Sequence, residues 1–463
     1  MAIITYEGFE NYSSIASVQT YLNYERTTSG GTIELISTAD ANGITGRNGG
    51  TCLKLTNTVP CGGPVDNIIK PVYPRVFLKN PNNATLSSGI FGFAWYARLP
   101  SGGGWGNFTP IAVLCDTSGK PHFFIGINSN LNIEIRSYTT GLTLGNGNSS
   151  SGTYWDAQFI NRVDIDDIDY YDYNAARGCG DIVSHSFSSN HNQMLSIINL
   201  GGTLQSGGTL APLLGTSSNL ITMNAWNYIE VKFVLSTTNT GSIQLKINKN
   251  ASDANLDINV SSIRTTYQNN TNAIGVALGQ WWGHNSANTS ALHTANLWNM
   301  YYDDYYILDL TGANNNFLGR VSCKKFSYNN VVNYTMTTPA NSGTALTNFN
   351  ETYSGIGTLS TTNVGNVVGQ TLDVKSTGVS SETFSPIFVR QYVHGYKTDA
   401  NSDVGIGATD GVNTISSTNV NFNNNSINGT LKFRDYDNAP DGAEWTNQKI
   451  ADTIFKHTIT VAS

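Results

Sequence analysis

The chain has 463 residues, enough for two or three domains with cores of their own. Only 12% of the residues are charged, the formal net charge is −7 and no basic cluster stands out, so the sequence excludes the electrostatic footprint of a nucleic-acid-binding protein. No apolar run reaches the roughly 18 residues that span a bilayer, so we expect no membrane insertion.

The composition favours an all-β protein with many loops. The chain contains 56 Asn, nearly as many as its 57 charged residues (25 basic and 32 acidic), together with 46 Gly. Asn, Gly and Ser populate turns, whereas Thr, Val, Ile and Tyr favour strands. The hydrophobic fraction of 39% and the aromatic fraction of 11% indicate packed cores rather than disorder.

Short strand-like segments separated by Gly and Pro recur along the first third of the chain. They lie at residues 31–37, 52–55, 89–99, 109–114, 122–127 and 131–138. Five cysteines without CxxC spacing make a zinc site improbable on sequence grounds. Cys52 and Cys61 could close a short loop, but we favour buried thiols made in a reducing cytoplasm.

The strand pattern breaks between about residues 140 and 220. A Gly/Asn/Ser-rich stretch, the acidic aromatic block DIDDIDYYDY and the Gly/Ser-rich stretch GGTLQSGGTLAPLLGTSSN follow one another there. We interpret this segment as an insertion between two strands of a sandwich, projecting from one of its ends. Such insertions tend to carry exposed surface that contacts partners.

Residues 226–326 show the clearest strand pattern. WNYIEVKFVL, GSIQLKIN, GVALGQ and NMYYDDYYILD follow one another, with turn residues between them. The sequence predicts an antiparallel meander inside a β-sandwich. The period of two puts Leu245 on a buried face and Lys246 on the opposite one, so Leu245→Asp should be ruinous and the same change at Lys246 tolerated.

After residue 318 shorter strands predict a second, smaller β-rich unit. SETFSPIFVRQYVHGYK and NGTLKFRDYD carry its strand pattern. Residues 446–455 are the best candidate for a helix, with apolar members at Trp445, Ile450 and Phe455. The domains expected are therefore a jelly roll over 1–312, with the insertion at about 140–220, and a C-terminal β domain over 313–463.

A set of motifs in fixed order resembles one family. ITYEGFENY opens the chain, WNYIEVKF and GSIQLKIN lie in the middle, and YYDDYYILD is followed by NNNFLGRV. The members of these motifs that carry the match are Asp303, Asp304, Tyr306, Asp309, Asn316, Phe317, Leu318, Gly319 and Val321, with Trp445 and Thr446 near the end. The chain resembles tailed-bacteriophage virion structural proteins with a concanavalin A-like (laminin G-like) jelly roll, although Arg320 stands where the family has Asp.

This resemblance implies an all-β fold: a concanavalin A-like jelly-roll sandwich, a loop-rich insertion and a smaller C-terminal β domain. It implies a non-enzymatic structural component exposed on the particle, either a tail or fibre-like protein or a capsid decoration protein. Its partners would be other virion proteins and copies of itself, and it would be located in the virion after synthesis in the host cytoplasm. No cofactor is implied.

Three tryptophans, Trp281, Trp282 and Trp298, are the candidate ligand or interface aromatics, with His284 and His293 nearby. Aromatic rings stack on sugars, and adjacent tryptophans also anchor subunit interfaces. Interface or core packing is the favoured interpretation. The alternative is a carbohydrate-binding module that serves adsorption to host surface glycans.

Two acidic groups are weighed as sites. Asp164, Asp166, Asp167, Asp169 and Asp172 could gather oxygen ligands for calcium, but their spacing is not that of an EF-hand, so a solvated loop is favoured. Asp303 and Asp304 are neighbours in a strand, so alternation sends them to opposite faces and excludes an acid/base pair. We expect one of them to bind loop amides.

No catalytic constellation appears in the sequence. The seven histidines form no HExxH motif, and there is no Gly-x-Ser-x-Gly elbow and no P-loop. A glycoside hydrolase on a jelly roll would need two carboxylates across a cleft, and no E-x-D-x-E-like strand is present. The sequence therefore predicts no catalytic, cofactor-binding or metal-binding residues, and no enzyme.

Overall fold

The structure is a computed structural model. It describes residues 3–10, 12, 15, 25–27, 31–57, 75–80, 84–98, 109–117, 121–137, 173–174, 179–180, 213–266, 270–279, 299–311, 315–336, 368–395, 403–422 and 430–461. The chain divides into two compact units. The first comprises Met1–Phe9 and Leu22–Cys323, and the second comprises Glu10–Tyr21 and Lys324–Ser463.

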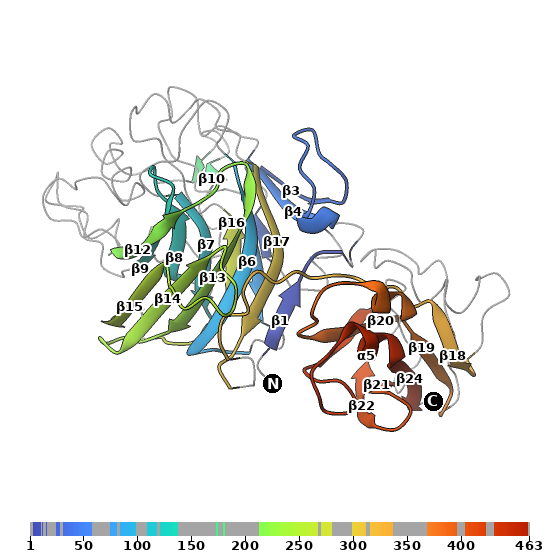
Figure 1. Ribbon diagram of the computed structural model, residues 1–463. Coiled ribbons are helices and arrows are strands. Elements are labelled where there is room, and N and C mark those ends of the chain that lie inside the picture. The colour runs from blue at the N-terminus through green and yellow to red at the C-terminus, as the bar shows by residue number, and fades with distance from the viewer. Residues whose placement is uncertain are drawn as a thin grey trace, which may run out of the picture. The chain divides into compact units, whose positions relative to one another are not determined.

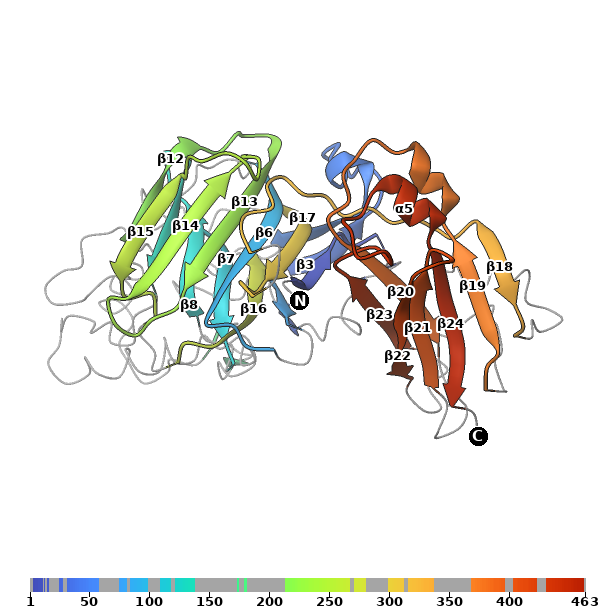
Figure 2. The ribbon, with the colours of Figure 1, turned by 60° about the horizontal axis from the view of Figure 1, so that its bottom comes forward.

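The first unit is a β-sandwich of two antiparallel sheets (Figure 1). Sheet 1 has the strand order β15-β14-β13-β6-β17-β4-β3, with β1 also paired to β17. Its strands are β1 (Ile3–Glu7), β3 (Gly31–Ile36), β4 (Cys52–Asn57), β6 (Ser88–Ala97), β13 (Ala225–Val234), β14 (Gly241–Ile247), β15 (Ile258–Ile263) and β17 (Asn299–Leu308). Figure 2 shows β13, β14 and β15 side by side.

Sheet 2 faces sheet 1 and has the order β12-β9-β8-β7-β16-β5-β2. Its strands are β2 (Glu25–Thr27), β5 (Arg75–Lys79), β7 (Thr109–Asp116), β8 (Pro121–Ile127), β9 (Asn132–Ser137), β12 (Leu213–Leu220) and β16 (Ala273–Gly279). The chain crosses between the sheets several times, as jelly rolls do. The predicted all-β jelly-roll fold is confirmed.

Aromatic side chains from both sheets fill the space between them. Phe91 of β6 and Phe233 of β13 lie with their ring centroids 6.1 Å apart, and Phe123 of β8 in sheet 2 meets Phe233 at 6.2 Å. The hydroxyl group of Tyr302 on β17 donates a 2.7 Å hydrogen bond to the carbonyl of Ile111 on β7. All five residues are fully buried, so the two sheets share one continuous core.

The chain between residues 226 and 326 is not the simple meander that the sequence predicted. β13 and β14 pair as expected, but β16 lies in sheet 2, and β17 returns to sheet 1 to pair with β6, β4 and β1. Local alternation cannot distinguish these arrangements, because each strand is half-buried in either sheet. A short strand that the sequence did not single out, β15, completes the edge next to β14.

The insertion between β9 and β12 ends earlier in the sequence than the expected residue 220. β12 pairs with β9, so residues 213–220 belong to sheet 2 rather than to the insertion. Within the insertion the structure describes only β10 (Tyr173–Asn174) and β11 (Cys179–Gly180), which pair with each other. The acidic block that contains Asp164 and Asp172 lies outside the described residues.

The outer face of sheet 1 is partly covered, which corrects one expectation. Leu245 is fully buried in the core, as predicted. Lys246 points to the opposite face but is only 3% exposed, and its ammonium group donates to the carbonyls of Asn250 and Ala251. It also lies 4.9 Å from the centre of the Phe317 ring. Lys246 is therefore a packed residue and not a tolerant surface position.

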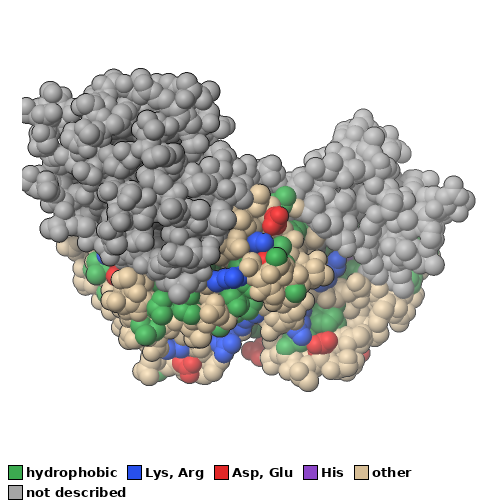
Figure 3. Space-filling model, turned by 90° about the horizontal axis from the view of Figure 1, so that it is seen from above, with side chains coloured by type: hydrophobic (Ala, Val, Ile, Leu, Met, Phe, Trp, Pro, Cys, Tyr) green, Lys and Arg blue, Asp and Glu red, His purple; other side chains and the backbone are tan. Residues whose placement is uncertain are grey.

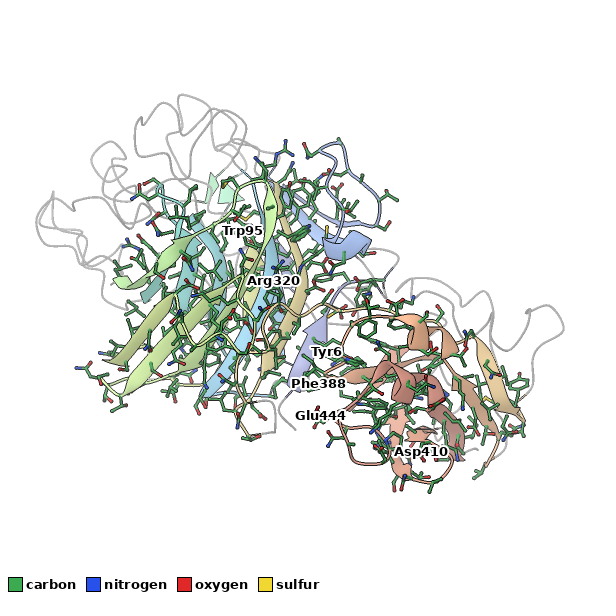
Figure 4. The ribbon with its side chains drawn as sticks, viewed as in Figure 1. Tyr6, Trp95, Arg320, Phe388, Asp410 and Glu444 are labelled. Atoms are coloured by element: carbon green, nitrogen blue, oxygen red, sulfur yellow. The ribbon has the colours of Figure 1, made fainter. Side chains whose placement is uncertain are left out.

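The second unit is the predicted smaller β domain. A five-stranded sheet has the order β18-β19-β24-β21-β22, and β20 pairs with β23 in a second sheet. The elements are β18 (Asn330–Tyr334), β19 (Thr371–Lys375), β20 (Val389–Gly395), β21 (Asp403–Thr409), β22 (Thr414–Asn421), β23 (Thr430–Tyr436), α5 (Asn447–Asp452) and β24 (Ile454–Val461). Asp410, labelled in Figure 4, closes the turn between β21 and β22 by accepting from the amides of Val412 and Asn413.

Short helical elements occur in both units. The 3-10 turn η1 (Arg47–Gly49) lies in the first unit, and η5 (Thr377–Ser381) lies in the second. The predicted helix is confirmed in shortened form as α5, which begins after Thr446, and the Thr446 side chain accepts from the Lys449 amide as an N-cap. Trp445 and Ile450 are buried in the core of this unit.

Candidate functional site

Three aromatic side chains lie in register on the outer face of sheet 1. On β6, Trp95 has no exposed surface and belongs to the jelly-roll interior (Figure 4), so its neighbour Tyr96 points outward. Trp226 on β13 stands opposite Tyr96 on one side, and Tyr301 on β17 stands opposite it on the other. We call Trp226, Tyr96 and Tyr301 the aromatic row.

The rings of the aromatic row contact one another edge to face. Tyr96 and Trp226 have ring centroids 5.6 Å apart at an interplanar angle of 80°, and Tyr96 and Tyr301 are 5.9 Å apart at 76°. Trp226 and Tyr96 are partly exposed, whereas Tyr301 is buried and packs with Ile44 and Cys52. The row therefore offers two supported aromatic rings to solvent.

A polar group continues the row across the next two strands. Lys54 of β4 is opposite Tyr301, and Glu34 of β3 is opposite Lys54. The Lys54 ammonium lies 3.0 Å from Asp40 and 3.7 Å from Glu34. The Tyr301 hydroxyl donates to the same Asp40 oxygen at 2.8 Å. Three aromatic rings, Lys54 and Glu34 are thus aligned over five adjacent strands, and Asp40 from the loop after β3 binds Lys54 and Tyr301.

Asp40 organises this end of the site. Its carboxylate accepts from the amides of Asn42 and Ile44, which closes the loop after β3. Burial opposes its ionisation, but the hydrogen bonds from Tyr301, Lys54 and the loop amides outweigh burial and hold the pKa of Asp40 well below its usual range. The site therefore keeps this negative charge at any physiological pH.

A second polar cluster on this face holds residues 315–323, which we call the covering passage. Arg47 forms a 2.9 Å ion pair with Asp304, and its guanidinium also donates to the carbonyl of Val321. Asp304 accepts from the amide of Cys323, and Asp303 accepts from the amide of Arg47. These contacts fasten the covering passage and the loop after β3 to β17.

The two adjacent aspartates do not behave as alternation predicted. Asp304 has a positive φ of 49°, and the pairing of β17 with β6 shifts register between Asp303 and Tyr306. This bulge lets both carboxylates reach Arg47, so they do not diverge to opposite faces. The expectation that one of them binds loop amides is confirmed, since each accepts from a backbone amide.

Glu230 on β13 forms the other attachment of the covering passage. It accepts hydrogen bonds from the amides of Leu318 and Gly319 and from the hydroxyl of Tyr306. Burial raises its pKa to about 7, against the lowering effect of these donors. Glu230 is only 1% exposed and its donors all come from the protein, so we assign it a structural role.

The tyrosines of this face are poorly suited to act as bases. Burial and the hydrogen bond to Asp40 raise the pKa of Tyr301, and burial raises the pKa of Tyr228 and Tyr306. A tyrosine that serves as a general base needs the opposite shift. The arrangement is therefore suited to holding a ligand by stacking and hydrogen bonds.

Two histidines that are buried among the described residues, His122 and His457, are likewise held in place by their neighbours. Burial lowers the pKa of His122, which bonds Thr266 and the carbonyl of Asn272. Burial also lowers the pKa of His457 to about 4, and that ring bonds Gln391. Among the residues that the structure describes, no group of three or more His, Cys, Asp or Glu side chains could hold a metal ion.

The aromatic residues that the sequence singled out cannot be placed relative to this site. Trp281, Trp282, Trp298, His284 and His293 fall between β16 and β17, outside the described residues. The sequence did not single out Tyr96 and Tyr301 as a site. Their outward position near the ends of predicted strands was a usable signal, but their proximity depends on strand order. Within the described part of the chain, no helix is long and apolar enough to cross a membrane.

Comparison with known proteins finds distant structural matches. No family model and no curated protein matches the sequence. Among solved structures, an endo-β-1,4-glucuronan lyase from the fungus Trichoderma reesei matches with 11% identity, 66% of this chain and 95% of the other covered, and a TM-score of 0.36. A marine PL-14 alginate lyase from Aplysia kurodai matches with 12% identity, 67% and 100% covered, and a TM-score of 0.37.

A carbohydrate esterase from Shiga toxin-encoding bacteriophage phi24B also matches, with 10% identity, 67% and 99% covered, and a TM-score of 0.31. These likenesses are to β-sandwich proteins that act on carbohydrates. They contradict the prediction of a non-enzymatic structural protein of a phage particle, because the matching proteins are polysaccharide lyases and an esterase. The exclusion of enzymatic activity was drawn from missing motifs, and a jelly roll can bring catalytic groups together from separate strands without one.

Proposed function

We propose that the protein is carbohydrate-active and that its jelly roll binds a polysaccharide chain on the outer face of sheet 1. The observation that carries this proposal is the aromatic row of Trp226, Tyr96 and Tyr301, aligned in register over three neighbouring strands. Rings fixed by their neighbours lose little conformational freedom when a sugar stacks on them.

The geometry of the rings and their polar neighbours supports an extended ligand. Trp226 and Tyr96 stand at 80° to each other, so they contact two sugar units rather than one flat ring. Lys54 and Glu34 follow on the next two strands, and the half-exposed Glu34 carboxylate offers acceptors to sugar hydroxyls. Since strands are spaced about 4.8 Å apart, the five residues of Trp226, Tyr96, Tyr301, Lys54 and Glu34 span about 19 Å.

The proposal is tested by binding. Affinity electrophoresis in soluble acidic and neutral polysaccharides should retard the wild-type protein in at least one gel. Trp226→Ala and Tyr96→Ala should each abolish most of the retardation. Both rings pack against the cluster of Ile44, Cys52 and Tyr301, so thermal melts check that each variant is folded at the temperature of the gel.

Tyr334→Ala provides a matched control, since Tyr334 is a partly exposed aromatic residue on β18 of the second unit. It should bind as the wild type does. Binding by the Trp226 and Tyr96 variants at wild-type strength would contradict the proposed site. Measuring new reducing ends in the same polysaccharides after incubation with the protein shows whether cleavage accompanies binding.

A further inference from the structure

Arg98 extends the site beyond the aromatic row. It follows Ala97, the last residue of β6, and the amide of Asn224 still donates to the Ala97 carbonyl there. The pairing of β6 with β13 and the residue before it therefore continues as far as Ala97. Because Arg98 is two residues after Tyr96, alternation places it on the same outer face. It is partly exposed, next to the ring that we propose receives the sugar.

The charge of Arg98 acts on the aromatic row and has no partner among the described residues. Its positive charge lowers the pKa of Tyr301, against the larger raising effect of burial, which places the guanidinium close to this row. No hydrogen bond or ion pair links it to another described residue. Figure 3 shows, on one face of the molecule, Lys and Arg side chains in blue and Asp and Glu side chains in red among uncharged surface. Among the described residues, Arg98 is thus a cation without a carboxylate partner.

The other cation of the site is already neutralised. Lys54 lies between Asp40 and Glu34, and Asp40 stays ionised. Glu34 is three strands away from Tyr96 in the sheet order, about 14 Å at the usual strand spacing. That separation exceeds the Debye length of about 8 Å at physiological ionic strength, so Glu34 does little to repel an anion beside Tyr96.

We propose that Arg98 makes the site selective for acidic sugars, with its guanidinium binding the carboxylate of a uronic acid unit stacked on Tyr96 and Trp226. This inference rests on the proposed polysaccharide site and adds its substrate class. A planar guanidinium matches a carboxylate with two parallel hydrogen bonds. A neutral hexose presents a hydroxymethyl group at the same carbon and gains no charge-assisted bond.

The test compares two oligosaccharides that differ only in this group: a β-1,4-linked glucuronic acid hexamer and the β-1,4-linked glucose hexamer. Isothermal titration calorimetry should show that the wild-type protein binds the acidic hexamer about tenfold more tightly or better, as a hydrogen bond to a charged group predicts. Arg98→Gln should remove this difference and leave the affinity for the glucose hexamer unchanged.

Arg320→Gln is the matched control, because Arg320 is an exposed arginine of the same unit on the covering passage (Figure 4). It removes the same charge and should keep the preference. The inference is overturned if Arg98→Gln retains the preference, or if the wild type binds both hexamers equally while Tyr96→Ala loses both. Failure of the wild type to bind any polysaccharide would instead overturn the proposed function itself, and the inference with it.

Discussion

The hydroxyl group of Tyr306 on β17 donates a hydrogen bond to the carboxyl group of Glu230 on β13, across the intervening strand β6. The contact is possible because Gly92 lies between them. A Cβ atom at Gly92 would stand 2.5 Å from the Tyr306 ring and 3.2 Å from the Glu230 side chain. A glycine in a central strand thus makes room for the carboxyl that holds the covering passage.

The contribution of Glu230 to the stability of the protein should fall as the pH rises from about 4.5 to about 7. Burial raises the pKa of Glu230 from 4.5 to about 7, so the folded state binds this proton more tightly than the unfolded state does. The stabilisation is complete below pH 4.5 and is lost as the pH passes 7, with a slope of up to about 1.4 kcal/mol per pH unit.

Urea unfolding of the wild type and Glu230→Gln at several pH values measures this effect. Glutamine keeps the oxygen that accepts from Leu318 and Gly319 but cannot titrate. The difference in unfolding free energy between the two proteins should grow in favour of glutamine between pH 5 and pH 7. A difference that stayed constant over this range would show that Glu230 ionises normally.

Gly319→Ala should loosen the covering passage. Gly319 has a φ of +80°, and a Cβ atom there would meet the amide nitrogen of Ala251 at 2.5 Å. We expect a loss of about 2 kcal/mol or more in unfolding free energy, because both the conformation and the contact are incompatible with a side chain. Gly411→Ala is the control. Gly411 has a φ of +94°, but no atom lies within 4 Å of the added Cβ. The Gly411→Ala variant therefore measures the cost of the positive φ alone.

Leu245→Asp and Lys246→Asp should both destabilise the first unit. The first places a charge in the core, with an expected cost above about 3 kcal/mol. The second replaces a donor to the Asn250 and Ala251 carbonyls with a carboxylate, with an expected cost of about 2 kcal/mol. Gln244 lies on the same outer face, but its side-chain amide is exposed. Gln244→Asp should therefore cost much less. If Gln244→Asp lowered the melting temperature more than Lys246→Asp did, the covered position of Lys246 would be refuted.

Asp435→Ala should destabilise the second unit by about 3–5 kcal/mol. Asp435 binds Arg390 through two hydrogen bonds of 2.6 and 2.9 Å, and the Arg390 side chain is only 1% exposed, so its charge would be left buried. Glu382→Ala breaks the exposed pair with Lys324 and should cost less than about 1 kcal/mol. Equal losses from the two variants in chemical denaturation would contradict this difference in burial.

The local elements were predictable because they depend on short-range patterns. Alternation located β6, β8, β9, β13 and β14, and the apolar pattern around residues 446–455 indicated a helix where α5 lies. The sheet to which each strand belongs was not predictable, as β16 shows, since pairing partners lie far apart in the chain. The bulge at Asp304 also escaped prediction, because alternation assumes a regular strand.

The candidate site also depends on strand order, which the sequence does not reveal. Tyr96 and Trp226 are 130 residues apart in the sequence, and Trp226 and Tyr301 are 75 apart. Only the strand order β13-β6-β17 brings the three together. The sequence drew attention instead to Trp281 and Trp282, which are neighbours in the chain. Adjacent aromatics are visible in a sequence, whereas a row across a sheet requires the topology.

The most direct test of the polysaccharide site is hydroxyl-radical footprinting of the full chain, with and without a polysaccharide that retards it. We expect Trp226 and Tyr96 to be protected from oxidation by the bound chain, while Tyr334 and Tyr392 of the second unit stay as reactive as before. Protection that omitted Trp226 and Tyr96 and appeared elsewhere would contradict a binding site on the outer face of sheet 1.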